Sequence, residues 1–198
     1  MLELLHHFFA AVCGQNPDHT WMPGAVPLPI CQRCTGLYAG AAIALILQIW
    51  VKPRPTARYL GLHGLFLPLV APFGLHWVPD GPVPRTLTGA LFGFAVVAFL
   101  WLPIREALKP NCRLFAFRDP HRAYGAGLLA TLALVPLLAE CGGKVGAVLL
   151  CVFACGGAVG LSLLVLANLL VWFRGIQFRC LSLGRSGLER QDRGRQHL

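Results

Sequence analysis

The stretch VGAVLLCVFACGGAVGLSLLVLANLLVWF, from Val145 to Phe173, contains no charged side chain. A helix that crosses the hydrocarbon core of a bilayer needs about 20 consecutive, mostly apolar residues. This stretch exceeds that length, so it predicts a transmembrane helix that either tilts or extends beyond the bilayer.

The rest of the chain has the same character. Of the 198 residues, 56% are hydrophobic and 13% are charged, and the mean hydropathy is +0.63. Soluble domains carry about 25% charged residues. The sequence therefore predicts an all-α, polytopic transmembrane helical bundle in a lipid bilayer, with about five spans. The predicted spans are Thr35–Val51, Tyr59–Val78, Thr86–Ile104, Ala123–Cys141 and Val145–Phe173.

Three regions follow from these spans: an extracytoplasmic segment 1–34 that contains Cys and His, the bundle 35–173, and a basic cytoplasmic tail 174–198. The start of the chain, MLELLHHFFAAVC, is apolar but too short to cross a membrane. It also lacks the basic beginning of a secretory signal. It predicts a short helix that lies at the membrane interface.

The distribution of positive charge predicts the orientation. All but three of the 17 lysines and arginines fall in alternate connections, after the first and third predicted spans and in the tail. The exceptions are Arg33, Arg85 and Lys144. Because positive residues of short loops stay in the cytoplasm, the N-terminus is expected outside and the C-terminus inside, in the cell inner or plasma membrane. The net charge of +9 is thereby explained without nucleic-acid binding.

A cluster of potential metal ligands precedes the first predicted span. Cys31 and Cys34 have the spacing that lets both sulfurs reach one tetrahedral ion, and Cys13 and His19 could complete a Cys3His zinc site. His6, His7 and His76 are alternative fourth ligands. We expect such a knuckle to clamp the outer end of the bundle as a structural site.

The same cysteines permit two other interpretations. An oxidising compartment could join Cys31 or Cys13 to Cys34 in a disulfide. Alternatively, Cys31 and Cys34 could form the redox pair of a membrane thiol–disulfide oxidoreductase, with Cys13 or Cys141 as the exchanging thiol. Thiol redox chemistry is the only enzymatic candidate, because the sequence contains no nucleotide-binding loop, nucleophile elbow or His-Glu-x-x-His motif.

Motifs in the first half of the chain resemble a known family. CGQ at Cys13–Gln15, PLPICQRCTGLYAG at Pro27–Gly40 and RTLTGALFG at Arg85–Gly93 are similar to the signature of the predicted membrane proteins called domain of unknown function 2085. In that family a histidine follows the first cysteine, whereas this chain has Gly14. The resemblance implies the membrane architecture, and it implies that His19 replaces the missing histidine or that the site is incomplete.

Two spans begin alike, with Thr-Gly-x-x-x-Gly at Thr35 and Thr88, each preceded by an arginine. Glycines four residues apart allow close helix contact, and Gly156 and Gly160 repeat the spacing. Such faces could also bind other subunits, which would make the protein an accessory subunit of a larger membrane complex. Arg33 and Arg85, beside two helix N-termini, are candidates for an outward anion site.

His63 lies inside the second predicted span. An ionisable group there faces protein, a cavity or a cofactor. A neutral imidazole bonded to a carbonyl is the ordinary explanation, and ligation of haem or chlorophyll is the alternative.

Overall fold

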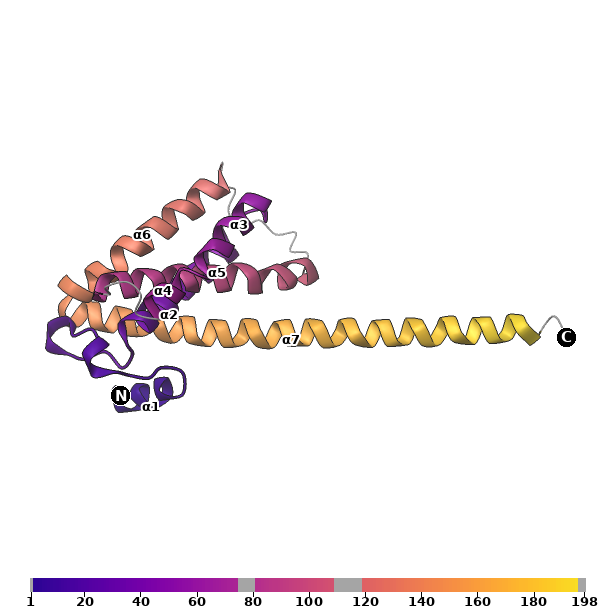
Figure 1. Ribbon diagram of the computed structural model, residues 1–198, viewed down its shortest axis with the longest axis horizontal. Helices are drawn as coiled ribbons and strands as arrows, with labels where there is room; N and C mark the ends of the chain where they lie inside the picture. The colour runs from indigo at the N-terminus through magenta and orange to yellow at the C-terminus, as the bar shows by residue number, and fades with distance from the viewer. Residues whose placement is uncertain (1, 75–80, 109–118, 196–198) are drawn as a thin grey trace.

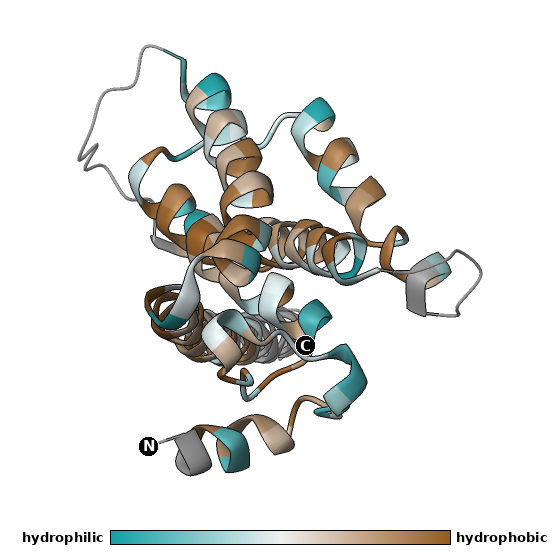
Figure 2. Cartoon of the chain, turned by 90° about the vertical axis from the view of Figure 1, so that its left-hand side faces the viewer, coloured by the Kyte–Doolittle hydropathy of each residue, from teal (hydrophilic) through white to brown (hydrophobic). Residues whose placement is uncertain are grey.

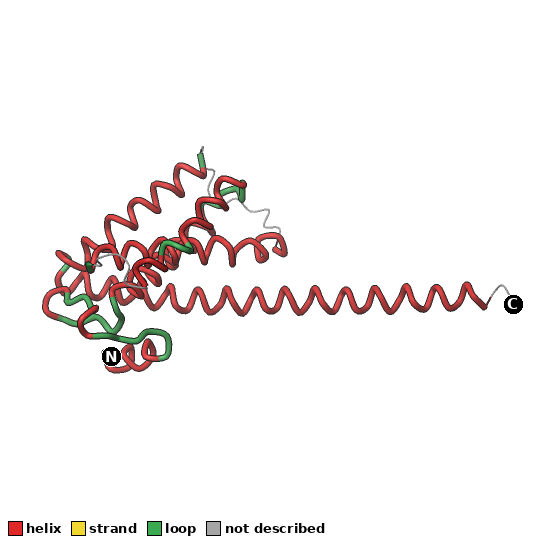
Figure 3. The backbone as a smooth tube through the Cα atoms, in the orientation of Figure 1, coloured by secondary structure: helices red, strands yellow, loops and turns green. Residues whose placement is uncertain are grey.

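The computed structural model describes residues 2–74, 81–108 and 119–195 (Figure 1). Within these ranges the backbone consists of helices and connecting loops (Figure 3), with an isolated antiparallel bridge between Thr20 and Cys31. The α-helices are α1 (Leu2–Ala10), α2 (Gln32–Trp50), α3 (Ala57–Phe66), α4 (Val70–Gly74), α5 (Pro82–Leu108), α6 (Pro120–Cys141) and α7 (Gly143–Arg195), and the 3-10 helices are η1 (Pro17–His19) and η2 (Pro23–Ala25).

The predicted all-α membrane architecture is confirmed. In the described part of the chain, four helices are long and apolar enough to cross a membrane, namely Gln32–Trp50, Pro82–Ala107, Pro120–Cys141 and Gly143–Phe173. Seen from the end that carries the N-terminal segment, the helices are largely hydrophobic, and hydrophilic residues gather mostly in loops and at helix ends (Figure 2).

The second predicted span, Tyr59–Val78, is not one continuous helix. The structure breaks it into α3 and α4, and residues 75–80 lie outside the described ranges. The break falls at Pro68, because proline disfavours helical geometry in the residue before it and cannot donate a backbone hydrogen bond. Within the described ranges, four helices are therefore long and apolar enough to span a membrane, and α3 and α4 lie between α2 and α5 in the chain (Figure 1).

The centre of the bundle is the parallel pair α2 and α5. A Cβ atom added to Gly36 would lie 1.9 Å from the carbonyl oxygen of Thr86, and one added to Gly89 would lie 2.1 Å from that of Arg33. Gly93 similarly faces Leu37. The two Thr-Gly-x-x-x-Gly motifs thus pack against each other and bring the starts of both helices side by side. Their spacing predicted close helix contact, but it did not predict which helices would meet.

The long helix α7 also lies parallel to α2, but the contact uses a different glycine from the expected one. Gly157, rather than Gly156, packs against Tyr38. A Cβ added to Gly157 would lie 1.8 Å from the carbonyl oxygen of Tyr38. A Cβ on Gly156 would meet nothing within 4 Å, whereas one on Gly160 would meet Leu45. The backbone of α7 stays helical as far as Arg195, well past the rest of the bundle (Figure 1).

Together these contacts place the beginnings of α2, α5 and α7 at one end of the molecule, while α6 runs back towards that end (Figure 1). The N-terminal segment with α1, η1 and η2 covers this end. The cysteines and arginines singled out in the sequence meet here.

Candidate metal centre

Three of the four predicted metal ligands come together at the start of α2. The ligand atoms of Cys13, Cys31 and Cys34 all lie within 4.8 Å of one another. Cys31 is the N-cap of α2, Cys34 lies in its first turn, and Cys13 follows α1. Sulfurs bound to one tetrahedral zinc would be about 3.8 Å apart, given Zn–S bonds of about 2.3 Å. The donor set and its spacing therefore fit a zinc ion.

The loop between α1 and α2 is fixed so that Cys13 meets the helix start. Trp21, which is buried, donates from Nε1 to the hydroxyl of Thr86 on α5 at 2.9 Å. The Gln15 amide donates to the carbonyls of His6 at 2.7 Å and Pro29 at 2.9 Å. Phe9, directly before the turn that leads to Cys13, is fully buried. These contacts hold the loop on the bundle.

The three thiols interact directly. The backbone N–H of Cys31 donates to Sγ of Cys13 at 3.4 Å. Hydrogen bonds from Cys31 and Cys34 lower the pKa of Cys13, and the same interaction with Cys13 raises the pKa of Cys31. Without a cation, one negative charge is thus favoured on Cys13 and opposed on its neighbour. A bound metal cation would stabilise all three as thiolates.

All six cysteines that the structure describes in full are free thiols. Cys141 is exposed at the end of α6 and is not part of the three-sulfur group, while Cys151 and Cys155 pack within α7. A disulfide would require two sulfurs about 2.05 Å apart. The ligand atoms of Cys13, Cys31 and Cys34 lie close enough together to hold one metal ion.

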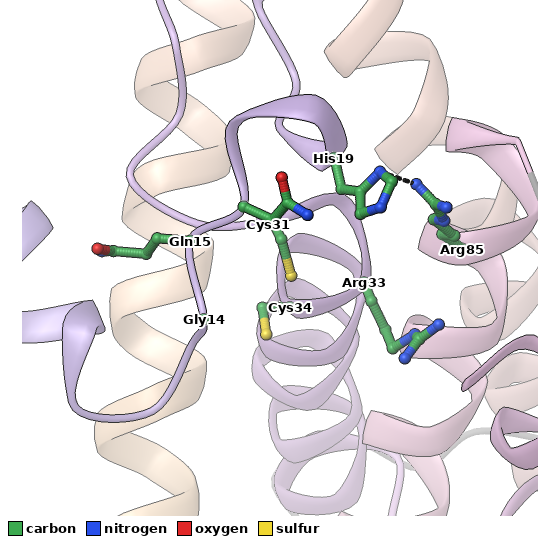
Figure 4. A pocket seen from close by; sticks show the side chains of 8 residues that line it. Gly14, Gln15, His19, Cys31, Arg33, Cys34 and Arg85 are labelled. Carbon is green, nitrogen blue, oxygen red and sulfur yellow. Dashed lines mark hydrogen bonds between the residues drawn. The ribbon is translucent and has the colours of Figure 1, made fainter. Parts of the chain in front are cut away.

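The fourth predicted ligand lies elsewhere. His19, at the end of η1, directs Nδ1 to the guanidinium of Arg85 rather than joining the three sulfurs. The alternative ligands His6 and His7 are exposed on α1, and His76 lies outside the described residues. The structure thus groups three thiols and leaves the imidazole on the opposite side of a pocket (Figure 4).

This pocket has a volume of about 300 Å³ and is lined by residues of both the predicted metal site and the predicted anion site. Figure 4 shows the sulfurs of Cys31 and Cys34 beside each other, with Arg33, Arg85 and His19 across from them. Arg33 and Arg85 share the pocket because α2 and α5 begin side by side. The remaining lining residues are Gly14, Gln15 and Asn16.

His63 sits at the other end of the bundle and is 1% exposed. Its Nδ1 lies 2.8 Å from the carbonyl oxygen of Tyr59, and its Nε2 lies 3.1 Å from the hydroxyl of Tyr124. Because a carbonyl oxygen can only accept, Nδ1 donates and Nε2 accepts from Tyr124. Both nitrogens are engaged, which favours the ordinary explanation of a hydrogen-bonded neutral histidine over haem or chlorophyll ligation.

Several of these contacts were not foreseen from the sequence. The bond from Trp21 to Thr86 joins residues far apart in the chain, as does that from Tyr124 to His63. No spacing rule connects such pairs. A tryptophan in a loop followed by prolines was the available signal that the loop is anchored.

Fold and site together define a polytopic helical membrane protein with a thiol cluster where its parallel helices begin. Residues 13–99, which carry the three cysteines and both glycine motifs, match the family described as predicted membrane protein, domain of unknown function 2085. The resemblance seen in the motifs is thereby confirmed. No curated protein and no solved structure was found to match the chain.

Proposed function

We propose that this integral membrane protein binds one zinc ion through the thiolates of Cys13, Cys31 and Cys34. The single observation that carries the proposal is the convergence of three Sγ atoms within 4.8 Å from two separate parts of the chain. Sulfur ligands in this number favour zinc over the hard cations, which take oxygen ligands. The metal ties the N-terminal segment to the first turn of α2.

The site has a structural consequence and an open position. Cross-linking the loop to α2 removes conformational freedom from the unfolded chain, as a disulfide does. A closed structural zinc site has four protein ligands, whereas one with three keeps a position for another group. We infer that the fourth position faces the pocket, because Cys31 and Cys34 line it.

Two features support the orientation with this end outside the cytoplasm. Lysines and arginines concentrate in the connections that would face inwards. Arg33, Arg85 and Lys144 lie in the first turns of α2, α5 and α7, which run parallel, so these three residues share the end of the molecule opposite those connections. The membrane concerned is then the cell inner or plasma membrane, and segment 174–198 is cytoplasmic.

Metal analysis of the detergent-purified protein, with a thiol count before and after reduction, tests the proposal. We expect about one zinc per chain, loss of zinc in Cys31→Ser, and retention in the matched control Cys141→Ser, whose thiol is exposed and outside the cluster. Absence of zinc, with two thiols recovered only after reduction, would support a disulfide or the oxidoreductase alternative instead. Trapping a mixed-disulfide partner with Cys34→Ser would then distinguish those two.

A further inference from the structure

A long apolar groove lies beside α1, between α5 and α7. It has a volume of about 690 Å³, and its walls come from α1, α2, α5 and α7. Its lining residues in the described part of the chain include no charged side chain. Ser162 brings a hydroxyl group to the groove, but that hydroxyl donates to the carbonyl oxygen of Ala158 in the same helix at 2.9 Å. The groove therefore suits a hydrocarbon ligand, which needs no hydrogen bond.

The groove opens onto a surface that faces lipid. Both α5 and α7 are long and apolar enough to cross a membrane. On α7, the groove residues Val165, Leu166 and Leu169 are exposed, and so are the neighbouring residues Leu163 and Leu170. The core of a bilayer holds hydrocarbon and no water, so exposed apolar side chains of a spanning helix contact lipid chains. The groove is thus continuous with the lipid interface of α7.

The dimensions of the groove match one lipid chain. Its wall on α7 extends from Ala158 to Leu169, which is about 16 Å at 1.5 Å per residue. One acyl chain spans about 15 Å, half of the roughly 30 Å hydrocarbon core. A volume of 690 Å³ over this length gives a mean cross-section of about 43 Å². A helix with side chains is about 10 Å across and needs about 80 Å², so the groove is too narrow for a helix.

The segments that form the groove also carry the thiols of the metal centre. Val12 lines the groove directly before Cys13, and Tyr38 lines it one helical turn after Cys34. The rings of Phe9 and Tyr38 lie 5.7 Å apart and join the two segments. Whatever fills the groove therefore contacts both segments and supports the position of Cys13.

The helix α1 needs this support. It lies across the direction of α7, near the end where α7 begins (Figure 1, Figure 2). It has nine residues, and isolated helices shorter than about 12 residues are marginal in water. Phe8 and Val12 line the groove, yet they are 49% and 55% exposed. A hydrocarbon chain beneath these side chains would remove apolar surface from water and stabilise the helix on the bundle.

We propose that the groove binds one acyl chain of a membrane phospholipid and that this chain holds α1 against the bundle. The affinity comes from the chain rather than from the headgroup, because the groove offers apolar contacts. The consequence for the metal rests on the proposed zinc function: by holding α1, the lipid keeps Cys13 beside Cys31 and Cys34.

Native mass spectrometry of the delipidated protein in detergent, titrated with phosphatidylcholine, tests the proposal. We expect saturable binding of a single phospholipid. In Ser162→Phe the Kd should rise about 5- to 150-fold, because the new ring occupies the groove. Leu163→Phe is the matched control, since it places the same ring at an exposed position outside the groove and should leave the Kd unchanged. Val96→Phe fills the groove from α5 and should repeat the effect, with circular dichroism verifying that each variant is folded.

Amide exchange in residues 5–13 provides a second measurement that does not involve the metal. Phosphatidylcholine should slow this exchange in the parent protein and in Leu163→Phe, and it should have no effect in Ser162→Phe. Phosphatidylglycerol should act like phosphatidylcholine, because the groove contacts the chain.

Several results would overturn the inference. They are an equal phospholipid Kd in Ser162→Phe and Leu163→Phe, binding that depends on headgroup charge but on neither groove variant, and exchange in residues 5–13 that lipid does not change. A dimer that dissociates in Ser162→Phe would assign the groove to a second copy of the chain and would also overturn it. A protein that binds phospholipid as expected but no zinc would contradict the proposed function and leave this inference standing.

Discussion

The two ends of α2 each carry a cluster of polar side chains, and the clusters differ in whether they are closed. At one end Gln48 donates to the hydroxyl of Tyr59, and His63 is bonded through both ring nitrogens. At the other end three thiols lie close together, and two of them, Cys31 and Cys34, border a pocket of about 300 Å³ with Arg33 and Arg85. In the first cluster the polar groups bond one another, whereas the second cluster borders a pocket.

This difference separates a packing role from a binding role. A buried polar network whose members satisfy one another stabilises a single arrangement of helices. Reactive thiols and cations that share an open pocket instead suit an exogenous group. We therefore expect substitutions in the His63 cluster to affect the stability of the bundle and those in the Cys cluster to affect what it binds.

The largest expected effect is that of Cys13→Ala on zinc affinity. Removal of a direct ligand should weaken zinc by more than the roughly 10- to 100-fold typical of losing a supporting contact around a metal. Competition with a chelator measures this affinity. Amide exchange should also increase in residues 14–30, since Cys13 connects this loop to α2. An unchanged zinc affinity would show that Cys13 is not a zinc ligand. It would also contradict the proposed difference between a binding cluster and a packing cluster.

Gly36→Ala should cost the next largest amount, because it separates the two helices that support both clusters. The new Cβ would lie 1.9 Å from the Thr86 carbonyl oxygen, so the backbones must move apart. Overpacking of this kind costs about 1–3 kcal/mol or more in the free energy of unfolding. Denaturation in mixed detergent measures the loss.

Gly156→Ala is the matched control for this effect, because its Cβ would meet nothing within 4 Å. Alanine also favours helix over glycine by about 1 kcal/mol. We expect this variant to be as stable as the parent or slightly more stable. Equal destabilisation by both substitutions would contradict the close packing of α2 on α5.

His63→Leu tests the packing role of the hydrogen-bonded cluster around His63. The substitution leaves the Tyr124 hydroxyl without its imidazole partner, which costs about 1–3 kcal/mol of stability. Zinc content should remain that of the parent protein. Haem or chlorophyll absorbance in the purified parent that disappears in His63→Leu would instead make this histidine a cofactor ligand.

Trp21→Phe should have the smallest effect. It keeps the aromatic ring in the core but removes the hydrogen bond to Thr86, worth about 1 kcal/mol. Zinc binding should persist, since the loop retains its contacts through Gln15. Loss of zinc in this variant would show that the loop anchor, rather than the thiols alone, determines the metal affinity.

The membrane architecture could be predicted because a helix that crosses a bilayer must be long and apolar, and such segments are visible in the sequence. Long uncharged runs such as Val145–Phe173 predict the spans. The four-residue glycine spacing that begins at Gly36 and at Gly89 predicts close helix contacts. Both predictions need only the local pattern of residues. The break at Pro68 was less predictable, since prolines also occur in continuous transmembrane helices when neighbouring groups satisfy the freed backbone. The sequence also did not distinguish Gly156 from Gly157, because adjacent helix positions differ only in which neighbour they face.

The candidate site was predictable to the extent that its members share one segment. The spacing of Cys31 and Cys34 indicates a pair on one helix start, and Cys13 is close enough in sequence to join them. His19 lies closer to Cys31 in the sequence than Cys13 does, yet in the folded protein it contacts Arg85. That contact depends on how α5 packs against α2. The same packing creates the pocket that joins Arg33 to Arg85, which no local pattern encodes.

X-ray absorption at the zinc edge of the purified protein measures the coordination shell directly. We predict three sulfur ligands at about 2.3 Å and one oxygen at about 2.0–2.2 Å, with the sulfur number reduced in Cys31→Ser. Four sulfurs, or a nitrogen shell that disappears in His19→Ala, would contradict the open fourth position. Absence of stoichiometric zinc would contradict the metal site as a whole.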